Sequence, residues 1–229
     1  RIELERALAV ADRANNAVLG EREGRWTVQG DPTEGALIVA ARKAGIGEGS
    51  LQARLERVGE VPFSSERKLM STIHTDADSN GELLVFTKGA PDVLLTRCDR
   101  ELVGEGTRPL TAGRRAEILG TNEDLAGTAL RTLGVALRRI PRDALEPGKA
   151  DGEVEQELVF LGLIGMIDPP REEAAEAVRR ARSAGIRPIM ITGDHPRTAA
   201  VIAEELGIAD NGLAVTGAEL ERMEEETLD

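Results

Sequence analysis

The first part of the chain alternates helical and strand patterns of apolar residues. Apolar side chains recur at helical spacing over residues 1–18, and the predicted helix ends near Gly20. WTVQ at 26–29 predicts a short strand. In GDPTEGALIVAARKAG, a proline directly after Asp31 opens an apolar helical run, which predicts a helix capped by Asp31 and ended by Gly45. The GIGEGS that follows predicts a flexible connection.

The middle of the chain predicts a small sheet with helices. Asn80-Gly81 is a hairpin signal between two strand patterns, and Pro91 opens a short helix. A polar stretch, a helical pattern at 110–126 and a buried strand at 130–140 follow, and 141–156 is a turn-rich, acidic surface loop. The strands predicted before the first of these helices are 57–63, 69–75 and 83–87.

The last part alternates strand and helix patterns, as in an open α/β sheet. Ligands gather beyond the carboxyl ends of the strands in such sheets, and Thr192-Gly193-Asp194 follows one of them. The predicted strands are 158–167 and 186–192, and the predicted helices are 172–184 and 197–206.

Composition narrows the class of protein. The 229 residues, 41% hydrophobic, suffice for two modest cores, and a formal charge of −12 without a basic block argues against a nucleic acid partner. One cysteine and two histidines predict neither a disulfide nor a metal cluster, which fits a reducing, cytoplasmic setting. The longest apolar run has ten residues, whereas a helix needs about 20 to span a bilayer. Because the chain opens on Arg1 inside a helical pattern, we expect a piece of a longer protein.

Several residues have both a structural and a functional interpretation. Lys88 either ends a strand as a solvated charge or lies beside a helix N-terminus, where an anion would bind. Phe63 is a core residue or a ring that stacks on a purine, and composition favours the core. Asp31 and Glu34 of DPTE favour a helix cap over a ligand contact. Arg131, inside an apolar strand, faces either solvent or an anion.

Two aspartates end apolar strands and precede or adjoin loops. Asp168 and Asp194 are structural turns or part of a phosphate or Mg²⁺ site. The remaining rare residues favour ordinary roles. These are packing for Trp26 and Cys98, and a surface strand or loop for His74 and His195.

Six short motifs, in this order, resemble the large cytoplasmic loop of P-type cation-transporting ATPases of the calcium-pump type. The resemblance covers essentially the whole chain, and the set is far more specific than any one motif. The motifs are GDPTEGAL (30–37), PFSSERKLMS (62–71), FTKGAP (86–91), LRTLGVA (130–136), GMIDPPR (165–171) and ITGD (191–194).

This resemblance implies an α/β fold with two domains. Residues 1–169 would form a nucleotide-binding domain with a mainly antiparallel sheet flanked by helices. Residues 170–229 would form part of a Rossmannoid phosphorylation domain of the haloacid dehalogenase type. The pattern alone makes 158–167 the first strand of the second α/β unit, whereas the resemblance makes it the last strand of the nucleotide-binding domain.

The resemblance also implies roles for particular residues. Phe63 would stack on adenine, with Lys68 and Lys88 nearby and Glu34 at the adenine end. The remaining implied contacts are Arg131 and Leu133 toward the phosphates or ribose, Asp168 at the hinge and against nucleotide, and Thr192, Gly193 and Asp194 at the phosphate site, where Thr192 helps to hold the transferred group.

Two family motifs do not occur in the sequence: the phosphorylated Asp-Lys-Thr-Gly-Thr and the Mg²⁺-binding Gly-Asp-Gly-x-x-Asn-Asp. We therefore expect a monomeric fragment that binds ATP or ADP without hydrolysing ATP. The parent would be a membrane pump that uses ATP and Mg²⁺, with further phosphorylation, actuator and transmembrane domains as partners and calcium as the favoured ion. The rival is an interaction module of the same fold that binds no nucleotide. A phosphatase would need an Asp-x-Asp-x-Thr segment, which the sequence lacks.

Overall fold

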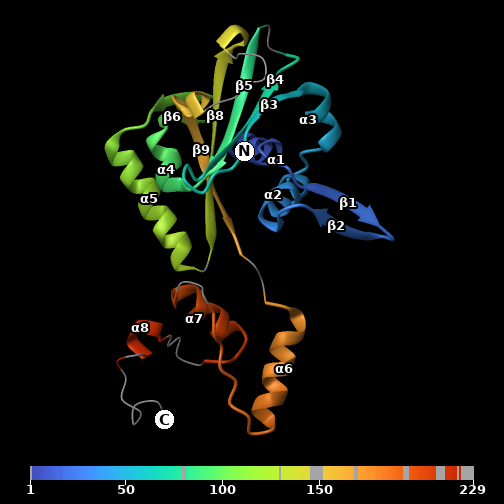
Figure 1. Cartoon of the computed structure of the whole chain (residues 1–229), viewed down its shortest axis with the longest axis vertical. Coiled ribbons are helices and arrows are strands. Elements are labelled where there is room, and N and C mark those ends of the chain that lie inside the picture. Colours follow the sequence, from blue (N-terminus) through green and yellow to red (C-terminus); the bar gives the residue numbers. More distant parts are fainter. Residues whose placement is uncertain are drawn as a thin grey trace. The chain divides into compact units, whose positions relative to one another are not determined.

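The computed structural model describes residues 2–78, 81–128, 130–144, 152–167, 170–192, 196–209, 215–220 and 222. The chain forms two compact units, shown with their elements in Figure 1. Unit 1 comprises Arg1–Asn122 and Thr132–Met166, and unit 2 comprises Glu123–Arg131 and Ile167–Asp229. Within the described residues, no helix is both long and apolar enough to span a bilayer.

A seven-stranded sheet organises unit 1. Its spatial order is β3-β4-β5-β8-β9-β6-β7, and every pairing with a defined register is antiparallel except that of β6 with β9. This confirms the mainly antiparallel sheet. The strands are β3 (Arg57–Val61), β4 (Leu69–Thr75), β5 (Glu82–Gly89), β6 (Cys98–Val103), β7 (Gly106–Pro109), β8 (Arg131–Pro141) and β9 (Leu158–Met166).

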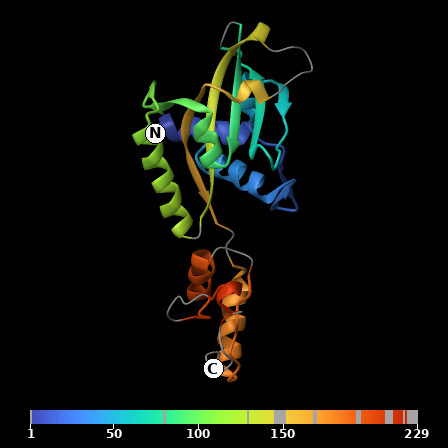
Figure 2. The same cartoon turned by 60° about the vertical axis from the view of Figure 1, so that its left-hand side comes forward.

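Helices cover both faces of this sheet (Figures 1 and 2). Helices α1 (Ile2–Arg13) and α2 (Pro32–Lys43) pack on the face that carries Leu84 and Phe86. Helices α4 (Pro91–Thr96) and α5 (Ala112–Gly127) pack on the opposite face, in a cluster with Leu69. The alternation of side chains along β4, β5 and β8 therefore separates two apolar cores.

Helix α2 begins as predicted. The Asp31 carboxylate accepts hydrogen bonds from the backbone N–H groups of Thr33 (2.8 Å) and Glu34 (3.2 Å), which otherwise lack partners in the first turn. The helix ends at Lys43, and Gly45 follows with a φ of 79°.

The predicted first helix is too long. Helix α1 ends at Arg13 because the Asn15 side chain accepts a hydrogen bond from the N–H of Ala17 (2.8 Å), a local turn that competes with the helix. The chain then forms an exposed two-stranded hairpin, β1 (Val18–Arg22) with β2 (Arg25–Gln29). The strand at 26–29 is confirmed, but Gly20 lies in β1.

Two further expectations about unit 1 are wrong, and one stretch without a predicted element contains strands. The segment predicted to be flexible after Gly45 includes the start of α3 (Glu48–Arg54), whose Leu51 packs against the core. The polar stretch after α4 contains β6 and β7. Within 141–156, 3₁₀ turns form at η1 (Arg142–Ala144) and η2 (Gly152–Glu155), and Glu155 is buried rather than on the surface.

The hairpin between β4 and β5 is confirmed by their antiparallel register, although Asn80 lies outside the described residues. Strand β9 lies within the seven-stranded sheet, between β8 and β6. The interpretation of 158–167 as the first strand of a second α/β unit is therefore wrong.

Unit 2 contains α6 (Glu172–Ser183), α7 (Pro196–Glu205) and α8 (Gly217–Leu220). The helices predicted at 172–184 and 197–206 are confirmed. The strand predicted at 186–192 does not form, and Ile189 and Ile191 are exposed. A strand needs a neighbour for its backbone N–H and C=O groups, and the described residues of unit 2 form no other strand.

The rare residues differ partly from their expected roles. Cys98 is buried, as predicted, and burial raises its pKa to about 12, so the thiol is inert. Trp26, expected to pack, is 68% exposed on β2, and His74, expected on the surface, is 2% exposed. His195 lies outside the described residues.

Candidate functional site

Lys88 is buried and paired with a carboxylate. It lies on β5 opposite Met70 of β4, is 7% exposed, and its Nζ donates to Glu34 Oε1 over 2.6 Å. The interpretation of Lys88 as a solvated charge is therefore wrong.

The alternative interpretation, a cation beside a helix N-terminus, applies to α2 and not to α4. Lys88 shares a sheet face with Phe86 and reaches Glu34 in the first turn of α2, whereas α4 packs on the opposite face. The lysine therefore binds a carboxylate of this chain, 54 residues away, on the α1 and α2 side of the sheet.

Glu34 is fixed at both carboxylate oxygens. Oε1 accepts from Lys88, and Oε2 accepts from the backbone N–H of Asn16 (3.0 Å). Burial lowers the pKa of Lys88, and the hydrogen bond and charge of Glu34 oppose that shift. The two charges compensate each other. A ligand would therefore meet a carboxylate fixed in position and no uncompensated lysine charge.

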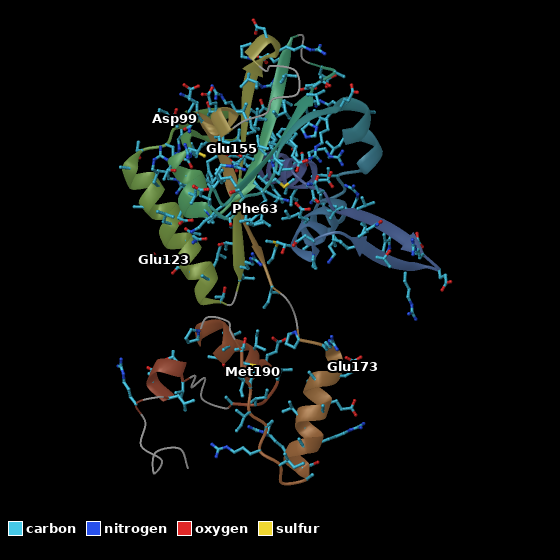
Figure 3. The ribbon with its side chains drawn as sticks, viewed as in Figure 1. Phe63, Asp99, Glu123, Glu155, Glu173 and Met190 are labelled. Carbon is cyan, nitrogen blue, oxygen red and sulfur yellow. The ribbon has the colours of Figure 1, made fainter. Side chains whose placement is uncertain are left out.

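Phe63 is exposed, which corrects its interpretation as a core residue. The sequence has three phenylalanines, one tryptophan and no tyrosine. Phe86 and Phe160 are 4% and 5% exposed, whereas Phe63 is 63% exposed (Figure 3). Burial in the apolar core therefore does not explain the position of this ring.

Phe63 lies in a tight turn between β3 and β4. The N–H of Lys68 donates to the carbonyl of Ser64 over 2.6 Å, and Lys68 has a φ of 54°, in the left-handed region. The turn therefore brings Lys68, which is exposed, close in space to the phenylalanine that begins it.

The turn rests on the glycine of FTKGAP. The N–H of Ala90 donates to the carbonyl of Lys68 (3.1 Å), and a Cβ at Gly89 would lie 2.2 Å from that oxygen. Only glycine permits this approach. The FTKGAP motif therefore takes part in two interactions. Its Lys88 pairs with Glu34, and its Gly89-Ala90 contacts the turn that carries Phe63 and Lys68.

The two predicted residues of β8 fall in different units. Leu133 belongs to unit 1, is partly buried and packs against the core that contains Val135. It adjoins Gly134, which pairs with Gly89. Arg131 belongs to unit 2 and is exposed, so its side chain is open to solvent, and the predicted contact with an anion stays a prediction.

Only one of the residues predicted for the phosphate site lies among the described residues. Thr192 belongs to unit 2 and is exposed, whereas Asp168, Gly193 and Asp194 lie outside the described residues. Among the described residues, no group of three or more His, Cys, Asp or Glu side chains could hold a metal ion.

Sequence reasoning missed Glu155 and Arg67 as parts of the site. Arg67 Nη1 lies 3.0 Å from Glu155 Oε2, and this ion pair joins the turn of Phe63 to η2. Arg67 was visible beside Lys68 in PFSSERKLMS, but no local pattern points to a carboxylate 88 residues away.

A cavity of about 370 Å³ also occurs in unit 1, away from this turn. It lies among the end of α1, α2 and the start of β3, with Asp12, Arg42, Arg57 and His74 in its lining. Phe63, Lys68 and Lys88 do not line it. Of the residues expected to contact nucleotide, Phe63 and Lys68 are therefore exposed outside this cavity, whereas Lys88 is buried against Glu34.

Comparison with known proteins matches the chain to two overlapping family models. Residues 3–173 match the family model for P-type ATPase cytoplasmic domain N, and residues 126–222 match haloacid dehalogenase-like hydrolases. The chain is 42% identical over 201 residues to a calcium-transporting ATPase of Listeria monocytogenes, which covers 87% of this chain and 22% of the relative.

Two further relatives match almost the whole chain. A calcium-transporting ATPase of Bacillus subtilis is 38% identical over 226 residues, 98% of this chain and 25% of the relative. A cation-transporting ATPase of Synechocystis is 39% identical over 224 residues, 96% and 24% respectively. The chain thus spans about a quarter of the length of these relatives. Since the domain N model covers most of it, the chain belongs to the P-type ATPase family.

Proposed function

We propose that unit 1 binds ATP or ADP, with the base stacked on Phe63. One observation carries the proposal: the only exposed phenylalanine of the chain lies in a turn held against Gly89-Ala90. The same turn carries Lys68, and the strand that the turn contacts, β5, carries Lys88, which pairs with Glu34 of α2. An exposed ring face beside polar groups is what recognition of a purine requires.

Each remaining residue has a proposed role. Glu34, held by Lys88, accepts a hydrogen bond from the exocyclic amine of adenine, since a carboxylate only accepts. Lys68 and Arg131 supply positive charge for the phosphates or ribose, with Leu133 as an apolar contact. Asp168 contacts nucleotide from the hinge.

We further propose that the chain is the cytoplasmic part of an integral membrane pump. The named activities of the relatives support cation transport, and two of the three relatives described above transport calcium. In this proposal residues 1–169 deliver ATP, with Mg²⁺, to an aspartate outside this sequence, and 170–229 contribute Thr192, Gly193 and Asp194 to the phosphate site. Transmembrane, actuator and remaining phosphorylation domains are the partners in the pump, and the fragment itself is monomeric.

The chain alone is proposed to bind ATP without hydrolysing it. Phosphoryl transfer needs an acceptor and a metal to neutralise charge, and the sequence contains neither the Asp-Lys-Thr-Gly-Thr nor the Gly-Asp-Gly-x-x-Asn-Asp motif. Phosphate release above a no-protein control, abolished by a substitution in this chain, would contradict this.

Isothermal titration with ATP tests nucleotide binding. We expect Phe63→Ala to weaken binding about tenfold or more, because stacking a base on an aromatic ring contributes roughly 1–3 kcal/mol. Trp26→Ala is the matched control, since Trp26 is the other exposed aromatic residue in the chain but lies on the β1–β2 hairpin. We expect it to leave the affinity unchanged. Absence of ATP binding by the unsubstituted chain, or equal affinity in both variants, would favour a module that binds no nucleotide.

A further inference from the structure

Glu155, labelled in Figure 3, is a buried carboxylate at the end of η2, and its ion pair with Arg67 joins it to the Phe63 turn. It is 2% exposed. Its Oε2 lies 3.0 Å from Arg67 Nη1, and its Oε1 accepts from the Ser71 hydroxyl over 2.8 Å. A carboxylate is retained in such a place only when paired and hydrogen-bonded, and both conditions are met here.

The hydrogen bonds around Glu155 continue to β5. Ser71 and Thr87 lie opposite each other on β4 and β5, and their hydroxyl oxygens are 2.8 Å apart. Because Ser71 gives its proton to the carboxylate, the Thr87 hydroxyl is the donor in this contact. Glu155 therefore ties η2 to the strand that carries Lys88.

Arg67 links Glu155 to the turn that carries Phe63. Its guanidinium donates to the carbonyl of Pro62, which precedes Phe63, and to that of Leu69 (3.4 Å), which follows Lys68. One side chain thus bridges both ends of the turn, and its charge is compensated by Glu155. The Arg67 side chain is 28% exposed, so most of it is fixed by packing.

We infer that Glu155 is a positioning residue for nucleotide binding: it fixes the Arg67 guanidinium, which holds the turn that presents Phe63 and Lys68. The inference rests on the proposed binding of nucleotide by unit 1. Without the carboxylate, Arg67 loses its anchor and the turn can sample other conformations. The ring must then be ordered again when a ligand binds, which lowers affinity.

The first test measures ATP affinity by isothermal titration in the full 229-residue chain. Glu155→Gln keeps the side-chain volume and removes the charge, and we expect about tenfold weaker binding. Glu157→Gln is the matched control, because Glu157 is an exposed carboxylate two residues away that pairs with Arg138 instead. We expect a change of less than about twofold there. Equal affinities of both variants with the unsubstituted chain would overturn the inference.

A double-mutant cycle separates positioning from a general loss of structure. If Glu155 acts through the Phe63 ring, Glu155→Gln will weaken ATP binding much less in a Phe63→Ala background than in the unsubstituted one. The same fold-loss in both backgrounds would show that Glu155 does not act through Phe63.

Amide hydrogen exchange tests the positioning without any nucleotide. Glu155→Gln should speed exchange at Lys68 and Ala90, whose N–H groups bond within and onto the turn, while amides of α5 stay unchanged. Unchanged exchange at these amides would overturn the inference whether or not ATP binds. If Glu155→Gln does not fold, Ser71→Ala removes one hydrogen bond to the carboxylate, and the same acceleration, smaller in size, is expected.

Discussion

At the scale of single residues, the site depends on partners that lie far apart in the sequence. The resemblance placed Lys88 and Glu34 in one pocket, but not their direct pairing, because nothing local to either residue shows how β5 and α2 meet. Likewise the exposure of Phe63 could not be predicted, since composition favoured a core position. The sequence allowed us to predict which residues belong to the candidate site. Their charge pairing and exposure depend on tertiary packing, which the sequence does not show.

The Lys88–Glu34 pair should contribute to stability mainly by avoiding an uncompensated charge. Their side chains are 8% and 15% exposed. Removing only the lysine, as in Lys88→Met, should lower the free energy of unfolding by about 3 kcal/mol, because Glu34 is left unpaired. Urea unfolding of the single and double variants measures this.

The double variant Lys88→Met with Glu34→Gln decides between pairing and simple packing. We expect its loss in the free energy of unfolding to be smaller than the summed losses of the two single variants by more than about 1 kcal/mol. Strictly additive losses would show that the two side chains do not stabilise each other.

His74 makes stability depend on pH. The Thr72 hydroxyl donates to the carbonyl of Arg13 (3.1 Å), so the Thr72 oxygen accepts from His74 Nε2–H (2.9 Å). Burial, followed by the charges of Arg13 and Arg57, lowers the pKa of His74 from 6.5 to about 4. The fold therefore favours neutral histidine.

This stabilisation is complete above the unfolded pKa and is lost as the pH falls from 6.5 toward 4. Between about pH 7.5 and about pH 4.5 we expect the His74 contribution to fall by roughly 2.5 kcal/mol. Urea unfolding at both pH values, compared with His74→Leu, isolates it from the carboxylates. An equal pH dependence in the variant would contradict the buried neutral state.

At the scale of elements, strong periodic patterns were predictable and irregular ones were not. Strands β4 and β5 contain β-branched or apolar residues and are buried along nearly their whole length, and a proline or cap marks where α2 and α4 begin. Strands β6 and β7 show no alternation, and β6 is held by β9, which comes much later in the chain. The pattern at 186–192 is a strong strand pattern, but pattern alone does not supply a pairing strand.

The contact between the turn and Gly89 predicts the effect of one methyl group. Gly89→Ala would place a Cβ 2.2 Å from the Lys68 carbonyl and 2.7 Å from Leu69 Cδ2. We expect a loss of about 2 kcal/mol in the free energy of unfolding, together with weaker ATP binding, because the turn must shift. Gly162→Ala in β9 is the control, since its Cβ would meet nothing within 4 Å. Equal stability of both variants would show that the turn does not depend on this approach.

At the scale of the whole molecule, the chain combines a match to the P-type ATPase cytoplasmic domain N with a match to haloacid dehalogenase-like hydrolases. Six motifs spread along the chain predicted the family, because their order together is far more specific than any one of them. Which unit holds Arg131 could not be read from them. Motif order specifies membership in a family, whereas the grouping of residues into units follows from packing.

Nuclear magnetic resonance titration of the isotope-labelled chain with ATP would locate the nucleotide site residue by residue. We expect the backbone amide shifts to concentrate at 62–69 and 88–90 and at Glu34, and the β1–β2 hairpin at 18–29 not to respond. Shifts confined to other parts of unit 1, or no shifts at ATP concentrations of several millimolar, would contradict a nucleotide site built around Phe63.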